Sequence, residues 1–210
     1  MDYLKEPLAR YIEDAAADKP TPGGGSVAAM AGALASTMAS MAANFTVGRD
    51  KFKDVEAEVR EALDHLAAAR RRLLDLAHQD MAAYQAIMEA YRLPKATDAE
   101  KAARGRAVQD ATRRSLGVVQ GVLDACRDIM VVTLRLSGIA NPNLISDVGV
   151  AAELALGAIK AARLNVEVNL SGLKDEAAAR TIRQQTESAV ADAETWADLV
   201  REAVLGKIRG

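Results

Sequence analysis

The sequence has few aromatic residues and a single cysteine. Phe, Trp and Tyr make up only 3% of its 210 residues, and the cysteine is Cys126. One cysteine excludes an intramolecular disulfide and any metal site built on a pair of cysteines. The neighbours of Cys126 include Val122, Ile129 and Met130, so we expect it to be a small core residue of a protein from a reducing compartment.

An excess of positive charge is also missing. The 27 Lys and Arg residues against 29 Asp and Glu residues give a formal net charge of -2. Nucleic acids and anionic membranes attract chains with a strong positive field, so we expect neither as a partner. Residues 1–17 carry several charges and no apolar run, so they do not resemble a secretory signal. The expected location is the cytoplasm.

Strand-like alternation of polar and apolar residues is absent as well, and helical spacing takes its place. Half of the residues are hydrophobic, which suits closely packed helices. We expect an all-α fold, an antiparallel helical bundle formed by one domain over residues 1–210. The predicted helices cover residues 3–17, 27–47, 54–92, 99–136 (with a possible interruption near Gly117 or Gly121), 146–170 and 175–208.

Residues 27–47 form a stretch of twenty-one residues without a formal charge. The length would allow a membrane crossing, but the many Ala, Ser, Thr and Gly residues give little drive for insertion. We therefore predict a buried helix at the centre of the bundle, with other helices around it. Small residues recur on one face (Ala28, Gly32, Ser36, Ser40, Asn44) and bulky residues form another stripe (Met30, Leu34, Met38, Met41, Phe45).

Asp80 interrupts an apolar stripe of the predicted helix 54–92. Val59, Leu66, Leu73 and Ile87 recur at seven-residue spacing, and Asp80 occupies the remaining position of that series. A carboxylate held inward is costly unless it is paired, and loss of solvent raises its pKa. Such a group suits proton transfer near neutral pH. The alternative is a structural carboxylate satisfied by a cation or an amide of a neighbouring helix.

Two further segments are candidates for ligand binding. The run Pro22-Gly23-Gly24-Gly25-Ser26 can present backbone amides at the start of a helix, or it can be a tight turn with Ser26 as N-cap. Asp147 lies at the start of helix 146–170, where capping is the simpler role. Asn165 shares that helix roughly 27 Å further on, so Asp147 and Asn165 cannot both contact one small group within a chain.

The two histidines, His65 and His78, are thirteen residues apart and lack a metal-ligand spacing. We therefore predict no catalytic metal. Arg49, Lys51 and Lys53 form a basic cluster, and such clusters are most often solvated surface.

Five runs, in order along almost the whole chain, resemble the signature of the formiminotransferase-cyclodeaminase C-terminal domain family, which includes methenyltetrahydrofolate cyclohydrolases. They are residues 20–29 with 44–48, 80–84, 91–97 with 100–101, 145–151, and 164–166 with 169–170. The resemblance implies a homodimer of helical bundles that binds a tetrahydrofolate derivative in a cleft. It also implies that no metal or redox cofactor takes part and that Asp80 is the catalytic acid/base.

The resemblance leaves two activities open: hydrolysis of 5,10-methenyltetrahydrofolate to 10-formyltetrahydrofolate, and cyclisation of formiminotetrahydrofolate with loss of ammonia. We expect the cyclohydrolase, because this chain carries no attached transferase domain. A non-catalytic helical scaffold dimer is the third reading.

By the same resemblance, we expect two groups of residues to hold the substrate. One group orients the pteridine, and the other binds the glutamate tail. The first comprises Pro22, Gly23, Gly24, Gly25 and Ser26 together with Asp147 or Asn165, and the second comprises Arg49, Lys51 or Lys95.

Overall fold

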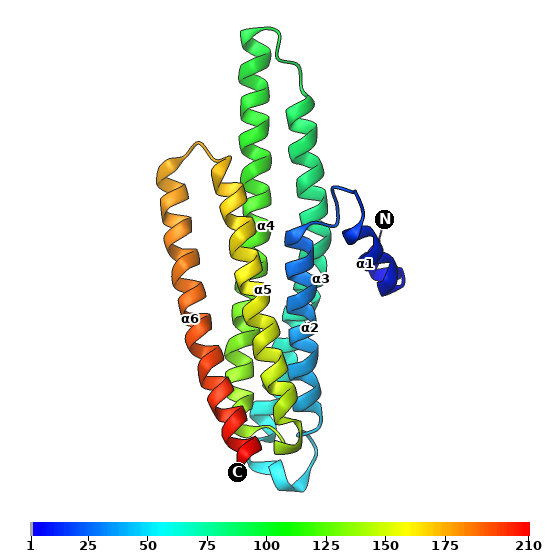
Figure 1. Cartoon of the computed structure of the whole chain (residues 1–210), viewed down its shortest axis with the longest axis vertical. Coiled ribbons are helices and arrows are strands. Elements are labelled where there is room, and N and C mark those ends of the chain that lie inside the picture. The colour runs from blue at the N-terminus through cyan, green and yellow to red at the C-terminus, as the bar shows by residue number, and fades with distance from the viewer. Residues whose placement is uncertain (1) are drawn as a thin grey trace.

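The computed structural model describes residues 2–210, and five long helices run up and down along one axis (Figure 1). No strand is found within residues 2–210, and the predicted all-α antiparallel bundle is confirmed. Short 3-10 turns precede three of the α-helices at Tyr3–Lys5, Asp50–Val55 and Pro142–Leu144. The α-helices are α1 (Leu8–Ala16), α2 (Gly24–Asn44), α3 (Glu56–Arg92), α4 (Asp98–Ile139), α5 (Ile145–Ser171) and α6 (Glu176–Arg209).

Helix α2 packs against α3, α4 and α5 through its small face. Ala28, Gly32, Ser36 and Ser40 are buried, because small side chains let neighbouring backbones approach closely. Among residues 2–210, α2 alone has the length and hydropathy of a membrane span, and 61% of its most apolar window is buried inside the protein. These properties are those of the core helix of a bundle, as predicted.

The bulky stripe of α2 behaves differently from the prediction. Leu34 is 52% exposed and Phe45 is 48% exposed. The expectation that other helices surround α2 on all sides was therefore wrong for a single chain. The close approach of α3, α4 and α5 to the small face leaves the larger side chains outside.

Helices α3 and α4 form a long hairpin that extends beyond the other helices (Figure 1). Helix α3 ends at Arg92, shortly before Pro94, and α4 begins with a capping box. Thr97 accepts from the Glu100 amide and Glu100 accepts from the Thr97 amide, which satisfies two donors of the first turn. The predicted interruption of α4 was wrong: Gly121 is buried against Leu76, so its role is close packing.

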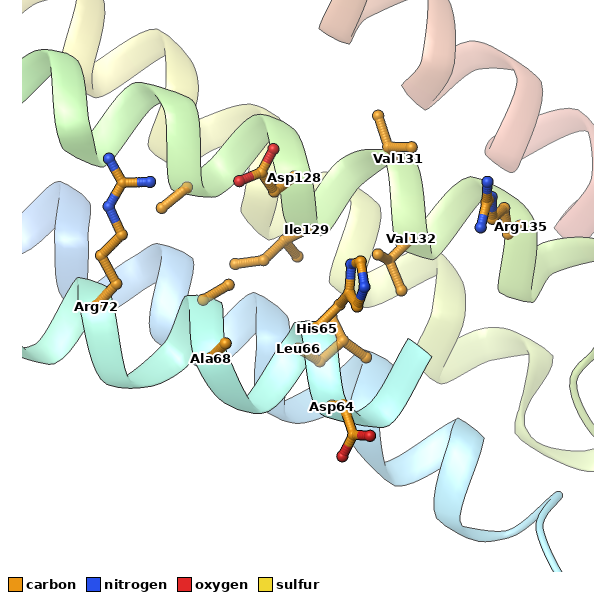
Figure 2. A pocket seen from close by; sticks show the side chains of 12 residues that line it. Asp64, His65, Leu66, Ala68, Arg72, Asp128, Ile129, Val131, Val132 and Arg135 are labelled. Carbon is orange, nitrogen blue, oxygen red and sulfur yellow. The ribbon is translucent and has the colours of Figure 1, made fainter. Parts of the chain in front are cut away.

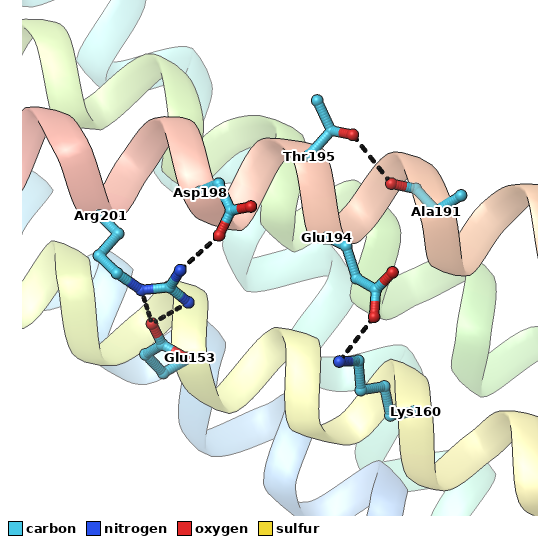
Figure 3. A network of polar contacts seen from close by, with 7 residues as sticks. All are labelled: Glu153, Lys160, Ala191, Glu194, Thr195, Asp198 and Arg201. Carbon is cyan, nitrogen blue, oxygen red and sulfur yellow. Dashed lines mark hydrogen bonds and ion pairs between the residues drawn. The ribbon is translucent and has the colours of Figure 1, made fainter.

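Helix α6 covers α4 and α5 and is joined to α5 by ion pairs (Figure 3). Arg201 contacts Glu153 at 2.8 Å and also Asp198, and Lys160 contacts Glu194 at 2.7 Å. Such exposed pairs contribute about 0–1 kcal/mol each. Burial of apolar residues such as Ala193 and Val200 therefore holds α6 in place.

Residues 2–16, here called the N-terminal arm, lie beside α2 and α3 (Figure 1). The single helix predicted for residues 3–17 is split, because Pro7 separates the first 3-10 turn from α1. Leu4, Leu8, Tyr11 and Ile12 have the spacing of one apolar face, but this face does not pack as a whole. Leu8 is 57% exposed and Ile12 is 58% exposed, whereas Tyr11 is buried. Tyr11 is therefore the apolar anchor of the arm.

Candidate functional site

Helix α3 holds Asp80 inward. Val59, Leu66 and Leu73 are fully buried along one stripe of the helix, and Asp80 is the next residue of that series. Its half-buried side chain lines a cavity of about 410 Å³, a size within the usual range for small-molecule sites. The predicted inward orientation of this carboxyl is confirmed.

The cavity lies where α2 begins and α5 ends, and its walls differ in character. Helix α3 provides a largely apolar wall with Tyr84, Ile87 and Tyr91. Opposite it, α4 and α5 provide neutral hydrogen-bonding groups. Among the described residues that line the cavity, Asp80 is the charged one, so the site favours a ligand with a positive centre. The neutral polar side chains of these two helices are Thr112 and Ser115 on α4 and Asn165, Asn169 and Ser171 on α5.

The carboxyl of Asp80 lies against the first turn of α2. The Ser26 amide donates a 2.9 Å hydrogen bond to Oδ2 of Asp80. A Cβ atom added at Gly25 would collide with Oδ1, so only glycine allows this approach. Burial raises the pKa of the Asp80 carboxyl and outweighs the Ser26 amide, which lowers it. The geometry gives a carboxyl held by one oxygen at the positive end of a helix.

A second close approach involves Gly24 and Asn165. A Cβ at Gly24 would lie 3.0 Å from Oδ1 of Asn165, tighter than ordinary contact. The Asn165 amide group donates to the Ala161 carbonyl at 2.9 Å, which fixes the orientation of the side chain. The two helix ends are thus joined at the cavity through glycine and asparagine.

The structure brings some of the predicted binding residues together. Gly23, Gly24, Gly25 and Asn165 all line the cavity with Asp80. Pro22 and Ser26 are buried behind it and do not line it. Gly23 is the N-cap residue of α2, so the alternative of Ser26 as N-cap was wrong.

Arg49, Lys51 and Asp147 do not join this cluster. They lie past the end of α2 or at the start of α5, roughly 30 Å from the cavity by the length of those helices. Within one chain, Asp147 and Asn165 therefore cannot contact one small group, as predicted, and Arg49 and Lys51 are equally remote from Asp80. The predicted capping role of Asp147 was wrong, because Leu144 is the N-cap of α5 and no side chain caps it.

Lys95 occupies a third position. It lies in the turn between α3 and α4, at the tip of the long hairpin and four residues beyond Tyr91. Lys95 does not line the cavity, but Tyr91 does. Lys95 therefore lies at the same end of the bundle as the cavity.

Sequence reasoning missed the residues that α4 contributes. Thr112 and Ser115 are buried at the cavity, but a Thr or Ser within a helix is common and gives no signal of its own. Thr112 and Ser115 are three residues apart, so both lie on one face of α4. This spacing indicates a polar patch at the cavity only once the helices that pack against that face are known.

A larger cavity of about 540 Å³ lies between α3 and α4 on another face (Figure 2). It is lined by Arg72, Asp128 and the imidazole of His65 over a floor of Leu66 and Ile129. Burial raises the pKa of the Asp128 carboxyl. Within the described chain, no three His, Cys, Asp or Glu side chains are grouped as metal ligands. This cavity contains no residue of the five sequence runs.

Comparisons with known proteins show similarity over most of the chain. The sequence profile of the formiminotransferase-cyclodeaminase family matches residues 7–188. A methenyltetrahydrofolate cyclohydrolase of Methylorubrum extorquens is 36% identical over 97% of this chain and 98% of its own length. A formimidoyltransferase-cyclodeaminase of Sus scrofa is 30% identical over 94% of this chain but only 36% of its own length.

A solved structure is also similar. The formiminotetrahydrofolate cyclodeaminase of Thermotoga maritima has a TM-score of 0.87 and 30% identity, with 98% of each chain covered.

Proposed function

Because the chain belongs to the formiminotransferase-cyclodeaminase family, we propose that it is a methenyltetrahydrofolate cyclohydrolase that hydrolyses 5,10-methenyltetrahydrofolate to 10-formyltetrahydrofolate. The similarity to the cyclohydrolase of Methylorubrum extorquens extends over both chains almost completely, which favours this activity. In this proposal the enzyme acts in the cytoplasm, and its own side chains carry out the reaction without a metal or redox cofactor.

The charge of the cavity is the observation that carries the proposal. The bridging carbon of the substrate lies between two nitrogens and shares a positive charge with them. Asp80 is the charged group among the described lining residues, and its carboxylate stabilises such a cation best where solvent is excluded. A cationic substrate also stabilises the ionised form of Asp80 when it binds.

The reaction needs one base and one acid. Water adds to the bridging carbon, and Asp80 accepts a proton from it. The resulting tetrahedral carbon then loses its bond to N5, and Asp80 returns the proton to that nitrogen. The formyl group stays on N10, and the second proton of the water is released. One carboxyl can serve both steps, because the proton it takes is the proton it gives.

We assign the remaining groups by their position. The aromatic rings of Tyr84 and Tyr91 suit the flat faces of the pteridine and aminobenzoyl rings. Asn165 and the Gly24 and Gly25 amides suit the polar edge of the pteridine, because first-turn amides have no acceptor within a helix. Both kinds of group line the same cavity.

The glutamate tail requires cations. Lys95 on the hairpin tip lies beyond Tyr91, in the direction in which a long ligand leaves the cavity. Lys51 and Arg49 reach it only from a second chain. Lys51→Ala and Lys95→Ala are expected to weaken binding of a polyglutamylated substrate, and unchanged affinity in both variants would contradict this role.

The second chain is proposed to pack on an apolar face formed by α2 and α5. Two stripes at alternating spacings of four and three residues lie on these adjacent helices, and each stripe includes strongly exposed residues. Patches of this kind mark protein interfaces. The members are Val27, Ala31, Leu34, Met38, Met41 and Phe45 on α2, and Val150, Leu154, Gly157, Ala161, Leu164 and Val168 on α5.

In the proposed homodimer the two faces meet antiparallel about a two-fold axis, the commonest symmetry of dimers. Val168 belongs both to this face and to the cavity, so the interface borders the site. Antiparallel pairing sets the end of one chain that carries Arg49, Lys51 and Asp147 beside the cavity of the other chain. This arrangement explains how Arg49, Lys51 and Asp147 can contribute to a site although they are far from Asp80 of their own chain.

The cyclodeaminase activity is the second candidate, and the similarity to the Thermotoga maritima structure favours it. Purified protein supplied separately with methenyltetrahydrofolate and formiminotetrahydrofolate distinguishes the two. Loss of the methenyl absorbance without release of ammonia supports the cyclohydrolase. Release of ammonia from the formimino compound at a greater kcat/KM favours the cyclodeaminase, and inactivity on both substrates supports a non-catalytic scaffold dimer.

A further inference from the structure

Tyr11 connects the N-terminal arm to the start of α2. Its side chain is 7% exposed, and its hydroxyl lies 3.0 Å from Oγ of Ser26. Ser26 is fully buried. A buried phenol hydroxyl requires a hydrogen-bond partner, and the only residue that meets this need for Tyr11 among residues 2–210 is Ser26.

Ser26 is the residue whose amide holds Asp80. The Tyr11 hydroxyl, Ser26 and the Asp80 carboxyl therefore form a short series of hydrogen bonds that joins α1, α2 and α3. Burial raises the pKa of the Tyr11 phenol most, and the hydrogen bond with the Ser26 hydroxyl lowers it. The charge of Asp80 also raises the pKa of Tyr11, so the two groups interact electrostatically. The arm thus reaches the proposed acid/base through one intermediate residue.

We propose that Tyr11 is a positioning residue for Asp80: its hydroxyl fixes Ser26, and Ser26 in turn holds Oδ2 of Asp80 so that Oδ1 stays beside Gly25 at the cavity. The expected effect of Tyr11 on catalysis rests on the proposed function. The structural part of the assignment, the effect of Tyr11 on Asp80, is independent of which substrate the enzyme uses.

The hydroxyl, not the ring, carries this role. The ring of Tyr11 meets the ring of Tyr3 edge to face, with centroids 5.4 Å apart, and it lines a small apolar cavity with Met30 and Met81. A phenylalanine would keep these contacts and so preserve docking of the arm. Only the hydroxyl points to the first turn of α2.

Few other ionisable groups face Asp80. On α3 itself these are Tyr84 and Tyr91, which line the same cavity. The groups on α4 and α5 that line the cavity are neutral. His78, two residues before Asp80, faces Asp2 of the arm at 3.2 Å. A shift in the carboxyl titration that follows loss of the Tyr11 hydroxyl is thus attributable to Asp80 if the His78 signals are the same as in wild type.

The test uses the full chain without substrate first. Carboxyl NMR titration of Asp80, with His78 followed in parallel, is compared in wild type, Tyr11→Phe and Ser26→Ala. Loss of the hydroxyl loosens Ser26 and weakens its hold on Oδ2, so the pKa of Asp80 is expected to rise in both variants. The double variant is expected to show no further rise, because both changes break the same connection.

Turnover supplies the second readout. The acidic limb of the pH profile is expected to move to higher pH in Tyr11→Phe, with kcat at neutral pH about threefold to tenfold lower and KM unchanged. Absent turnover in the wild type would overturn the proposed function, while the titration would still decide the role of Tyr11.

Tyr3→Phe is the matched control. The Tyr3 hydroxyl donates to Asp14 at 2.8 Å within the arm and does not contact Ser26. This variant is expected to leave the Asp80 titration unchanged. The positioning role is overturned if Tyr11→Phe titrates like wild type, or if Tyr3→Phe raises the pKa of Asp80 equally, because the arm would then act by docking alone.

Discussion

The amide of Ser26 donates a 2.9 Å hydrogen bond to Oδ2 of Asp80 and joins the first turn of α2 to the middle of α3. This contact explains why the glycine run and the acidic residue, far apart in sequence, form one site. The run brings a helix end with free amides, and the carboxyl lies against it because Gly25 has no side chain. The same contact orients the group to which we assign proton transfer.

The absence of a side chain at Gly25 is predicted to be essential. In Gly25→Ala the new methyl group overlaps Oδ1 of Asp80, so the carboxyl or α2 must move, at a cost of about 1–3 kcal/mol in unfolding free energy. We expect turnover to fall at least tenfold, because a displaced base loses its alignment. Urea unfolding and initial rates measure both effects.

Gly117→Ala is the control for this change. Gly117 is exposed within α4, and a Cβ there meets no atom within 4 Å. Alanine should raise the unfolding free energy by up to about 1 kcal/mol and leave the rate unaltered. A Gly25→Ala enzyme as stable and active as Gly117→Ala would refute the close approach of Asp80 to α2.

The Asp80 charge is predicted to destabilise the fold at neutral pH. Because burial raises the pKa of this carboxyl in the folded state, its contribution to stability is greatest below the unfolded pKa of about 3.9 and is lost as pH rises through the folded value. Asp80→Asn should therefore be more stable than wild type at pH 7, on the order of 1 kcal/mol. The difference should vanish near pH 3.5.

Thermal unfolding at several pH values shows whether Asp80→Asn is more or less stable than wild type. Asp54→Asn, a change at an exposed carboxyl, should stay within about 0.5 kcal/mol of wild type throughout. If Asp80→Asn is less stable than wild type at pH 7, the carboxylate is a structural group and the functional reading loses its main physical support.

The exposed face of α2 and α5 is predicted to hold the dimer together. Leu34→Glu places a charge on that face, which should convert the dimer to monomers in sedimentation velocity experiments. Leu199 on α6 is similarly exposed, 48% against 52% for Leu34, and lies off the face. Leu199→Glu should therefore keep the wild-type sedimentation coefficient. A monomeric wild type at micromolar concentration would exclude the proposed interface.

The sequence was sufficient to predict the fold class and the orientation of Asp80. Heptad spacing of Val59, Leu66 and Leu73 defines one face of a helix, and a residue on the same series must share that face. The end of α3 followed from Pro94, and the predicted start of α4 at residue 99 lies within one residue of the observed Asp98. These features depend on local chemistry, which periodicity and capping rules describe.

The outer surfaces were harder to predict, since hydrophobic spacing identifies a face but not what covers it. Leu8 and Ile12 have the spacing of core residues yet are exposed, as is Leu34. Gly121 was read as a possible break, although Leu76 packs on it.

The site was only partly predictable for the same reason. Gly24 and Asn165 meet because α2 and α5 are adjacent, which no local pattern encodes. The length of the predicted helix 146–170 already separated Asp147 from Asn165, but no local pattern showed that Arg49 lies at the opposite end of the bundle from Asp80. That separation depends on helix length and direction in the folded chain.

The most direct test of the account is the rate at which Asp80→Asn hydrolyses 5,10-methenyltetrahydrofolate, followed by loss of the methenyl absorbance. Asparagine keeps an oxygen for the Ser26 amide but cannot accept or return the proton, so kcat should fall about 10²-fold to 10⁴-fold in a protein with unchanged helical content. A folded Asp80→Asn enzyme with wild-type turnover would contradict the assignment of Asp80 as the acid/base.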